Sequence, residues 1–326
     1  MHCYCTLFDK NYLSRGLALY SSLQRQEPGV KVVMLCLDGA TRDALAALAL
    51  ANAELILLEQ LESYDPELRK VRGERLPAEY YFTCKPALMR YVALQSRKVS
   101  RITYLDSDLF CFSDPTILAA ELSRATVVLT PHRFPAYLKD WEQYGRFNAG
   151  WVSTSTDEEG MRFIEWWRER CLEWCKLKVD GEKFADQKYL NQVTREFPHA
   201  LALPHNGVNT GPWRLANIRI ESSGDKVLVE GQPLIFYHFH GLRRIFGNWY
   251  DSGLYEYHVP LSTQIRQLIY EPYMTELRAA EERLQRLPES IKRNLVSRRV
   301  RRSLADSFRY ARKIAGVFRS RTAMTG

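Results

Sequence analysis

The sequence contains no uninterrupted run of about 18 apolar residues, which is the length that a membrane-spanning helix needs. Its opening residues, MHCYCTLF, have no basic stretch followed by an apolar region and a small-residue cleavage site, so we expect no secretory leader. It also has no internal repeat and no low-complexity segment, which excludes repeat proteins and disordered chains. With 326 residues and 46% hydrophobic composition, it can bury the core of one large domain plus an appendage.

A complete set of zinc-binding cysteines is also missing. The seven cysteines are an odd number, and no second pair at zinc spacing completes four ligands. Cys3 and Cys5 would share one face of a strand, and Cys171 and Cys175 would lie one helical turn apart. We interpret all seven as small buried thiols in a reducing compartment, which predicts a cytoplasmic location.

Acidic residues are scarce in one region only. Residues 292–326 hold eleven Lys or Arg and one acid, so the net charge of +8 lies in this tail and the preceding residues are close to neutral. Apolar residues recur between the tail's arginines at three- to five-residue intervals, at Leu295, Val300, Leu304, Phe308, Ala311, Ala315 and Phe318. The pattern predicts a basic amphipathic helix over 291–326 that lies on an anionic membrane surface. The apolar stripe disfavours nucleic acid as the partner, and a solvated or partner-docked helix is the simpler alternative.

The first 58 residues alternate between strand and helix patterns. The expected elements are a strand at His2–Phe8, a helix from Tyr12, a doubly buried strand at Val30–Leu37, a helix at Thr41–Leu50 and a strand at Glu54–Leu58. This β-α-β-α-β opening predicts an α/β fold with a mostly parallel sheet and crossover helices. Ligands of such sheets bind outside the carboxyl ends of the strands.

Later elements are less regular. Residues 62–82 are charged and contain Pro66, Gly73 and Pro77, which predicts a loop that could close over a substrate. Then we expect a helix at Pro86–Gln95, a strand at Arg101–Leu105, a strand near Ala125–Leu129, a Trp-rich helix at Glu158–Cys175, and strands at Lys226–Glu230 and Pro233–His238. Residues 207–213 are turn-rich. A plain turn between strands, or exposed backbone close to a nucleotide or acceptor, would each explain Asn206, Gly207, Asn209, Gly211 and Trp213.

Asp106 and Asp108 follow what we count as the fourth strand, with only Ser107 between them. Two carboxylates on a short turn suit a divalent cation, which would neutralise a diphosphate leaving group as a glycosidic bond breaks. The simpler alternative is a strand end with two solvated acids, because D-x-D patterns also occur by chance. A phosphatase-like pair is disfavoured, since that chemistry needs the motif after the first strand.

Two histidines end the last predicted strand. Period-two spacing puts His238 and His240 on one face, and Gly241 with Arg243 and Arg244 favours a turn beside an anion. The alternative is a pair of histidines satisfied by the core or by water.

Together these motifs resemble the family 8-type retaining glycosyltransferases of the GT-A fold, a group that includes glycogenin and bacterial lipooligosaccharide galactosyltransferases. The resemblance runs in order through residues 4–249. The segments that match are Leu7-Phe8-Asp9-Lys10-Asn11-Tyr12 (uracil), Tyr104-Leu105-Asp106-Ser107-Asp108 (metal), Phe147-Asn148-Ala149-Gly150 (donor sugar), Asp186-Gln187-Lys188-Tyr189-Leu190-Asn191, and His238-Phe239-His240-Gly241.

The resemblance implies a role for each matching residue. It implies that Asp106, Asp108 and His238 bind Mn²⁺ or Mg²⁺ and that Gln187 and Asp186 are catalytic, with Gln187 near the anomeric carbon. It implies donor binding by Leu7, Asp9, Asn11, Tyr12, Ser107, Asn148, Ala149, Gly241 and Arg244. Lys85 and Arg90 are further donor-site candidates. The alternative interpretation is that both are solvated charges on a helix surface. The sequence departs from the family where Arg243, Arg244 and Trp249 replace a K-P-W segment and where Lys188 replaces a frequent acid.

The implied function is transfer of a hexose from a UDP-sugar to a glycan or lipid-linked glycan, with retention, in bacterial surface polysaccharide or lipopolysaccharide assembly. We expect a GT-A domain at 1–260, a helical extension at 261–290 and the tail at 291–326, with the enzyme peripheral on the inner face of the cytoplasmic membrane. A nucleotide-sugar pyrophosphorylase or phosphohydrolase is disfavoured, because no glycine- and lysine-rich activation loop follows the first strand. A non-catalytic sugar-nucleotide-binding protein is disfavoured by the intact motifs.

Overall fold

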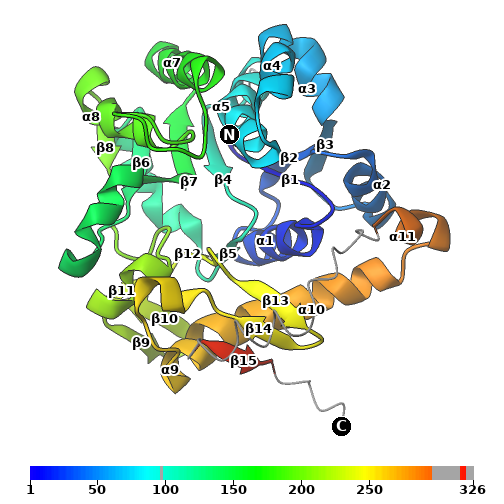
Figure 1. Cartoon of the computed structure of the whole chain (residues 1–326), viewed down its shortest axis with the longest axis vertical. Helices are drawn as coiled ribbons and strands as arrows, with labels where there is room; N and C mark the ends of the chain where they lie inside the picture. The colour runs from blue at the N-terminus through cyan, green and yellow to red at the C-terminus, as the bar shows by residue number, and fades with distance from the viewer. Residues whose placement is uncertain (96–97, 296–315, 321–326) are drawn as a thin grey trace.

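The computed structural model describes residues 1–95, 98–295 and 316–320. At its centre is a seven-stranded sheet in the order β3-β2-β1-β4-β7-β6-β8 (Figure 1). The first four strands along the chain run parallel: β1 (His2–Phe8), β2 (Lys31–Cys36), β3 (Ala53–Leu57) and β4 (Arg101–Leu105). Strand β7 (Phe147–Ser155) runs antiparallel to its neighbours β4 and β6 (Val127–Pro131), and β8 (Ala200–Ala202) is parallel to β6. The predicted α/β fold with a mostly parallel mixed sheet is confirmed.

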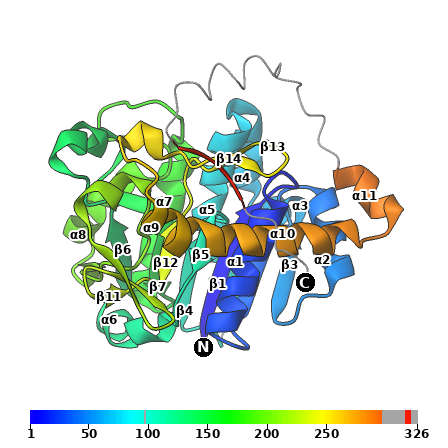
Figure 2. The same ribbon diagram turned by 90° about the horizontal axis from the view of Figure 1, so that it is seen from below.

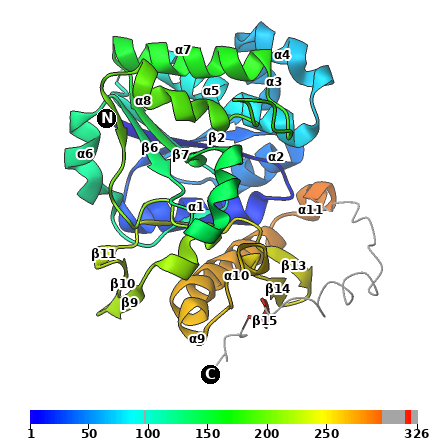
Figure 3. The ribbon, with the colours of Figure 1, turned by 60° about the vertical axis from the view of Figure 1, so that its left-hand side comes forward.

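Helices cover both faces of this sheet (Figure 3). One face carries α3 (Leu58–Tyr64), α4 (Pro66–Val71), α5 (Pro77–Gln95), α7 (Glu158–Glu173) and α8 (Val193–Glu196), and the other carries α1 (Leu13–Gln26), α2 (Gly39–Leu48) and α6 (Ala119–Arg124). Successive side chains of a strand point to opposite faces, so Cys3 and Cys5 enter one core while Tyr4 and Phe8 enter the other. The strand buried on both faces that the sequence predicts at Val30–Leu37 follows from this arrangement, as β2.

A third layer lies below α1. Helix α10 (Glu271–Gln285) crosses α1, and Figure 2 shows it running across that face toward α11 (Glu289–Leu295). Phe239 stacks on Tyr273 of α10, with ring centroids 3.8 Å apart, in a separate aromatic core. The layer also holds α9 (Thr263–Ile265) and three small sheets: β12 (Phe236–His238) with β5 (Leu109–Cys111); β9 (Ile220–Ser223), β10 (Lys226–Val229) and β11 (Gln232–Pro233); and β13 (Arg243–Phe246), β14 (Trp249–Asp251) and β15 (Val317–Arg319).

The prediction of a loop at 62–82 is wrong, because α4 and the start of α5 occupy this segment. Proline has no N–H to leave unpaired at the first position of a helix, and Pro66 and Pro77 begin these two helices. The Asp65 carboxylate caps α4 by accepting a hydrogen bond from the Leu68 N–H, and it also pairs with Arg168 of α7. Pro86, expected to begin a helix, lies inside α5.

Most of the predicted amphipathic tail, residues 296–315 and 321–326, lies outside the described residues. Its first residues belong to α11, as the helical pattern predicts, but Val317–Arg319 forms strand β15 and is not helical. Phe318 is 4% exposed there and packs near Tyr250 and Tyr270, so burial in a sheet overrides the helical spacing of this residue. In the described ranges no helix is long and apolar enough to span a membrane. All seven cysteines are free and buried, as expected.

Candidate active site

The site lies where the order of the parallel strands reverses, between β1 and β4. Doubly wound sheets bind ligands at this switch point, because the loops after the two strands diverge there. Asp106 follows β4, and its N–H donates to the Gly150 carbonyl of β7 (2.8 Å). Asp108 precedes β5, and its carbonyl accepts from the Phe239 N–H (2.9 Å). The Asp106-Ser107-Asp108 turn, named the metal turn below after its predicted role, is therefore held from two sides.

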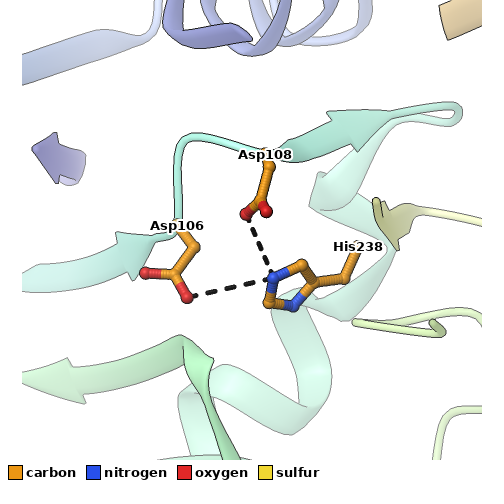
Figure 4. Close-up of side chains that lie close together, drawn as sticks. All are labelled: Asp106, Asp108 and His238. Carbon is orange, nitrogen blue, oxygen red and sulfur yellow. Dashed lines mark ion pairs between the residues drawn. The ribbon is translucent and has the colours of Figure 1, made fainter. Parts of the chain in front are cut away.

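Asp106, Asp108 and His238 each offer one ligand atom, and the three atoms lie within 4.8 Å of one another. Strand pairing places His238 opposite Leu109, so the imidazole faces the D-S-D turn (Figure 4). The Nε2 atom is 3.1 Å from Asp108 Oδ1 and 3.9 Å from Asp106 Oδ2. Burial opposes a charge on His238, but the Asp108 carboxylate outweighs it and raises the pKa of the imidazole. Burial likewise opposes the charge of Asp108, yet His238 holds the pKa of that carboxyl well below its usual range.

This group fits a divalent cation. Two carboxylate oxygens and one imidazole nitrogen form a mixed donor set of the kind that Mn²⁺ accepts. A Cβ atom at Gly150 would meet His238 Cε1 at 2.6 Å and Asp106 Oδ2 at 2.9 Å, so the site has room only because this residue is glycine. The glycine of the Phe147–Gly150 motif thus has a steric reason to be there.

Lys85 of α5 is buried beneath the same turn. Its Nζ atom is 3.0 Å from Asp106 Oδ1 and 3.2 Å from Asp186 Oδ2, and the side chain is 4% exposed. Burial opposes its charge, but the two carboxylates raise the pKa of the ammonium. Lys85 is therefore not the solvated helix charge that the sequence left open. It joins the metal turn to the Asp186-Gln187 segment.

Gln187 and Asp186 are both fixed through backbone groups. The Gln187 Oε1 atom accepts from the Ala149 N–H (3.2 Å), and its Nε2 atom donates to the Tyr144 carbonyl (3.0 Å). The carbonyl of Asp186 accepts from the indole N–H of Trp167 (2.8 Å), which lies in α7. Both residues face the same cavity as Asn148.

That cavity has a volume of about 350 Å³ and adjoins the metal turn. Asp106, Asn148, Ala149, Asp186, Gln187 and His238 line it, as expected from the motifs, together with Lys85. His240 and Trp213, which the sequence pattern had already singled out, also line the cavity. Sequence reasoning missed the rest of its wall, which consists of Phe82, His132, Phe134, Trp141, Tyr144, Phe184 and Tyr257. The signal available in the sequence for this wall was the series of aromatic residues along 134–144. The structure leaves most of that segment half-buried or exposed.

The predicted uracil loop lies at the end of β1. The Asp9 carboxylate accepts from the Asn11 backbone N–H and side-chain amide, both at 2.9 Å. Leu7 is buried in the core, whereas Tyr12 is 43% exposed with the Arg15 guanidinium 4.5 Å from its ring centre. Arg15, which sequence reasoning missed, also lies 3.9 Å from Asp108.

Two arginines predicted for donor binding do not join this group. Arg90 pairs with Glu165 of α7 and lies over the Tyr64 ring, and Arg244 pairs with Glu281 of α10 and with the Tyr250 hydroxyl. Arg244 lines a different cavity of about 670 Å³, between α10, α11 and the loop after β1.

Gly241 has a φ of +79°, and a Cβ there would lie 3.4 Å from Gly253, so it serves a tight turn.

Comparison with known proteins first defines the class. No family model matches the sequence. Its fold resembles solved structures of the galactosyltransferase LgtC: in complex with donor and acceptor sugar analogues (TM-score 0.54), and as an active-site mutant (TM-score 0.55). Each match has 16% identity over 90% of this chain and 100% of the other. The fold is therefore that of the GT-A glycosyltransferases.

Sequence relatives then define the family. The uncharacterized protein YfnF of Bacillus subtilis (strain 168) is 34% identical over 253 residues, which cover 74% of this chain and 81% of YfnF. The uncharacterized protein YfnD of the same strain is 28% identical over 84% of this chain and 88% of YfnD. The chain belongs to the YfnF family.

Proposed function

We propose that this protein is a metal-dependent hexosyltransferase that uses a UDP-sugar donor and a glycan or lipid-linked glycan acceptor. The observation that carries the proposal is the cluster of Asp106, Asp108 and His238 at the β1/β4 switch point, beside a cavity lined by Asn148 and Gln187. The family 8 resemblance and the GT-A fold support the donor class. We propose bacterial surface polysaccharide or lipopolysaccharide assembly as its setting.

The side chains of the site divide the work. Asp106, Asp108 and His238 would hold Mn²⁺ or Mg²⁺, which neutralises the charge of a departing diphosphate. Lys85 keeps the carboxylates of Asp106 and Asp186 in place. A retaining reaction through a covalent intermediate needs a carboxylate nucleophile, and the Gln187 amide is a poor one. We therefore propose a same-face displacement in which the acceptor enters on the side from which the diphosphate leaves.

The test is Mn²⁺-dependent release of UDP across UDP-galactose, UDP-glucose and UDP-N-acetylhexosamines. The Asp106→Ala variant is expected to lose at least about 100-fold in rate, because a bound metal contributes several kcal/mol of charge stabilisation. Asp43→Ala, an exposed carboxylate paired with Arg42 on α2, serves as the control and should match the wild type. Release of UMP in place of UDP, no release from any donor, or unchanged release by Asp106→Ala would contradict the proposal.

We also propose that the basic tail holds the enzyme on the inner face of the cytoplasmic membrane, on the strength of its charge and apolar spacing. Replacing Arg298, Arg299, Arg301 and Arg302 with glutamine should weaken binding to anionic liposomes by several kcal/mol, at about 1 kcal/mol per charge, and leave binding to neutral liposomes unchanged. Substitution is a cleaner test than truncation, because truncation would remove the buried Phe318. Equal cosedimentation of the variant and the wild type with anionic liposomes would refute this role.

A further inference from the structure

A chain of hydrogen bonds joins four side chains in series, from the His238 imidazole to His132, which also lines the cavity. The His238 Nδ1 atom is 3.1 Å from Asn209 Oδ1. The Asn209 Nδ2 atom is 2.9 Å from Asn148 Oδ1, and the Asn148 Nδ2 atom is 3.0 Å from His132 Nε2. The His132 Nδ1 atom lies 3.3 Å from the Arg146 carbonyl oxygen, where the chain ends.

Each hydrogen bond in this chain has only one possible direction. A carbonyl oxygen cannot donate, so Nδ1 of His132 carries the proton and Nε2 accepts from Asn148. By the same rule His238 carries its proton on Nδ1 and donates it to Asn209, which leaves Nε2 as the atom that faces Asp106 and Asp108. The chain therefore selects the tautomer of His238 that a metal ligand needs.

The Asn148 amide is oriented at both ends. Its Oδ1 atom accepts from the Gly150 N–H (2.8 Å) and from Asn209, while one of its N–H groups donates to His132. Among the described residues, its second N–H is left for a ligand in the cavity that Asn148 lines. Asn148 is thus set to donate to a sugar hydroxyl.

Asn209 is suited to its central place. It is 3% exposed, and its Nδ2 atom also donates to the Thr130 hydroxyl of β6 (2.8 Å). Backbone bonds of Thr210 to Phe236 and His238 hold the segment along β12. The φ of Asn209 is +52°, a left-handed conformation that asparagine tolerates better than most residues.

We propose that Asn209 is a positioning residue that joins the metal-ligand imidazole of His238 to the sugar-facing amide of Asn148. Its Oδ1 atom orients the His238 imidazole, which would bind the metal, and its Nδ2 atom orients the Asn148 amide, which would bind the sugar. Substitutions of Asn209 can therefore separate the effect on metal binding from the effect on sugar binding. The inference rests on the proposed function, since it assigns the metal and the sugar to these two partners.

Two variants separate the two sides. Asn209→Gly removes the side chain without straining the left-handed backbone, and Mn²⁺ affinity should fall about 10- to 100-fold, as is typical when the partner of a metal-bound histidine is lost. Asn209→Asp keeps an acceptor for His238 but has no N–H for Asn148. It should retain Mn²⁺ and UDP affinity within about threefold, yet bind the intact UDP-sugar about tenfold more weakly. Electron paramagnetic resonance of free Mn²⁺ measures the first quantity, and calorimetry with UDP and UDP-galactose measures the second.

Asn52→Gly is the matched control, because Asn52 is an exposed asparagine with a φ of +55°, in the turn between α2 and β3. It should leave all three affinities unchanged. Wild-type Mn²⁺ affinity in Asn209→Gly, or equal losses of Mn²⁺, UDP and UDP-sugar binding in Asn209→Asp, would overturn the positioning role alone. No Mn²⁺ binding by the wild-type protein would instead overturn the proposed function, and the positioning role with it.

Discussion

Replacing Lys85 with methionine should lower the free energy of unfolding by about 3–5 kcal/mol, because it leaves the Asp106 and Asp186 carboxylates without their shared cation. Burial already raises the pKa of Asp186, although Lys85 opposes the shift. Without Lys85 that pKa rises further, and a protonated Asp186 needs no cation. The deficit should therefore be full at neutral pH and shrink as the pH falls through the raised pKa. Urea denaturation at several pH values measures it.

Lys31→Met is the matched control. Lys31 pairs with Glu54 at 2.7 Å, but both side chains are 30% or more exposed, so its loss should cost less than about 1 kcal/mol. If the two variants lose equal stability, or if the Lys85→Met deficit does not change with pH, the buried ion pairs are not what stabilises this part of the fold.

Mn²⁺ should stabilise the wild-type protein and fail to stabilise Asp108→Asn. A ligand present at 100 times its dissociation constant adds about 2.7 kcal/mol to the free energy of unfolding. Metal binding needs a neutral His238, whose pKa is raised in the metal-free protein. The stabilisation should therefore grow as the pH rises through that pKa and weaken below it. Thermal denaturation with and without Mn²⁺, and after chelation with EDTA, tests this.

The stability of the metal-free protein should also depend on pH. In the metal-free protein, the raised pKa of His238 contributes stability that is present below its unfolded value of about 6.5 and is lost as the pH rises through the folded pKa. Mn²⁺ replaces that contribution at higher pH. Asp43→Asn, on the exposed face of α2, should respond to the metal as the wild type does. Equal Mn²⁺ stabilisation in Asp108→Asn would rule out Asp108 as a ligand.

The sequence was sufficient for the first half of the sheet. Over 1–58 the strand and helix periods are clear and turn residues separate them, so local pattern and final structure agree. The Asp106 turn was predictable for the same reason, since it ends an apolar strand. The strand at Val317–Arg319 was not predictable, because the spacing of Phe318 fits an amphipathic helix. In the structure Phe318 packs instead into an aromatic core beside a small sheet.

The rest of the site depends on contacts between distant segments. Lys85 reaches Asp106 and Asp186 only because α5 packs against β4. Arg244 carries the positive charge that would bind a diphosphate, but its guanidinium pairs with Glu281, which lies 37 positions further on. His132 carries no motif of its own, and only the return of β7 beside β6 reveals its bond to Asn148. Such pairings follow from topology, which one sequence does not display.

The residues that line the cavity come from segments that differ in their freedom to vary. Asn148 lies near the start of β7, and Asp106, Asp108 and His238 also lie at strand ends, so these four side chains are held by strands. Trp141, Tyr144 and Phe184, by contrast, come from segments that connect the strands. Loops accept substitution and insertion more readily than strands. Substitutions or insertions in 134–144 and 174–185 would therefore reshape this wall of the cavity and leave Asp106, Asp108, Asn148 and His238 in place, and a designer could graft these two segments for the same purpose.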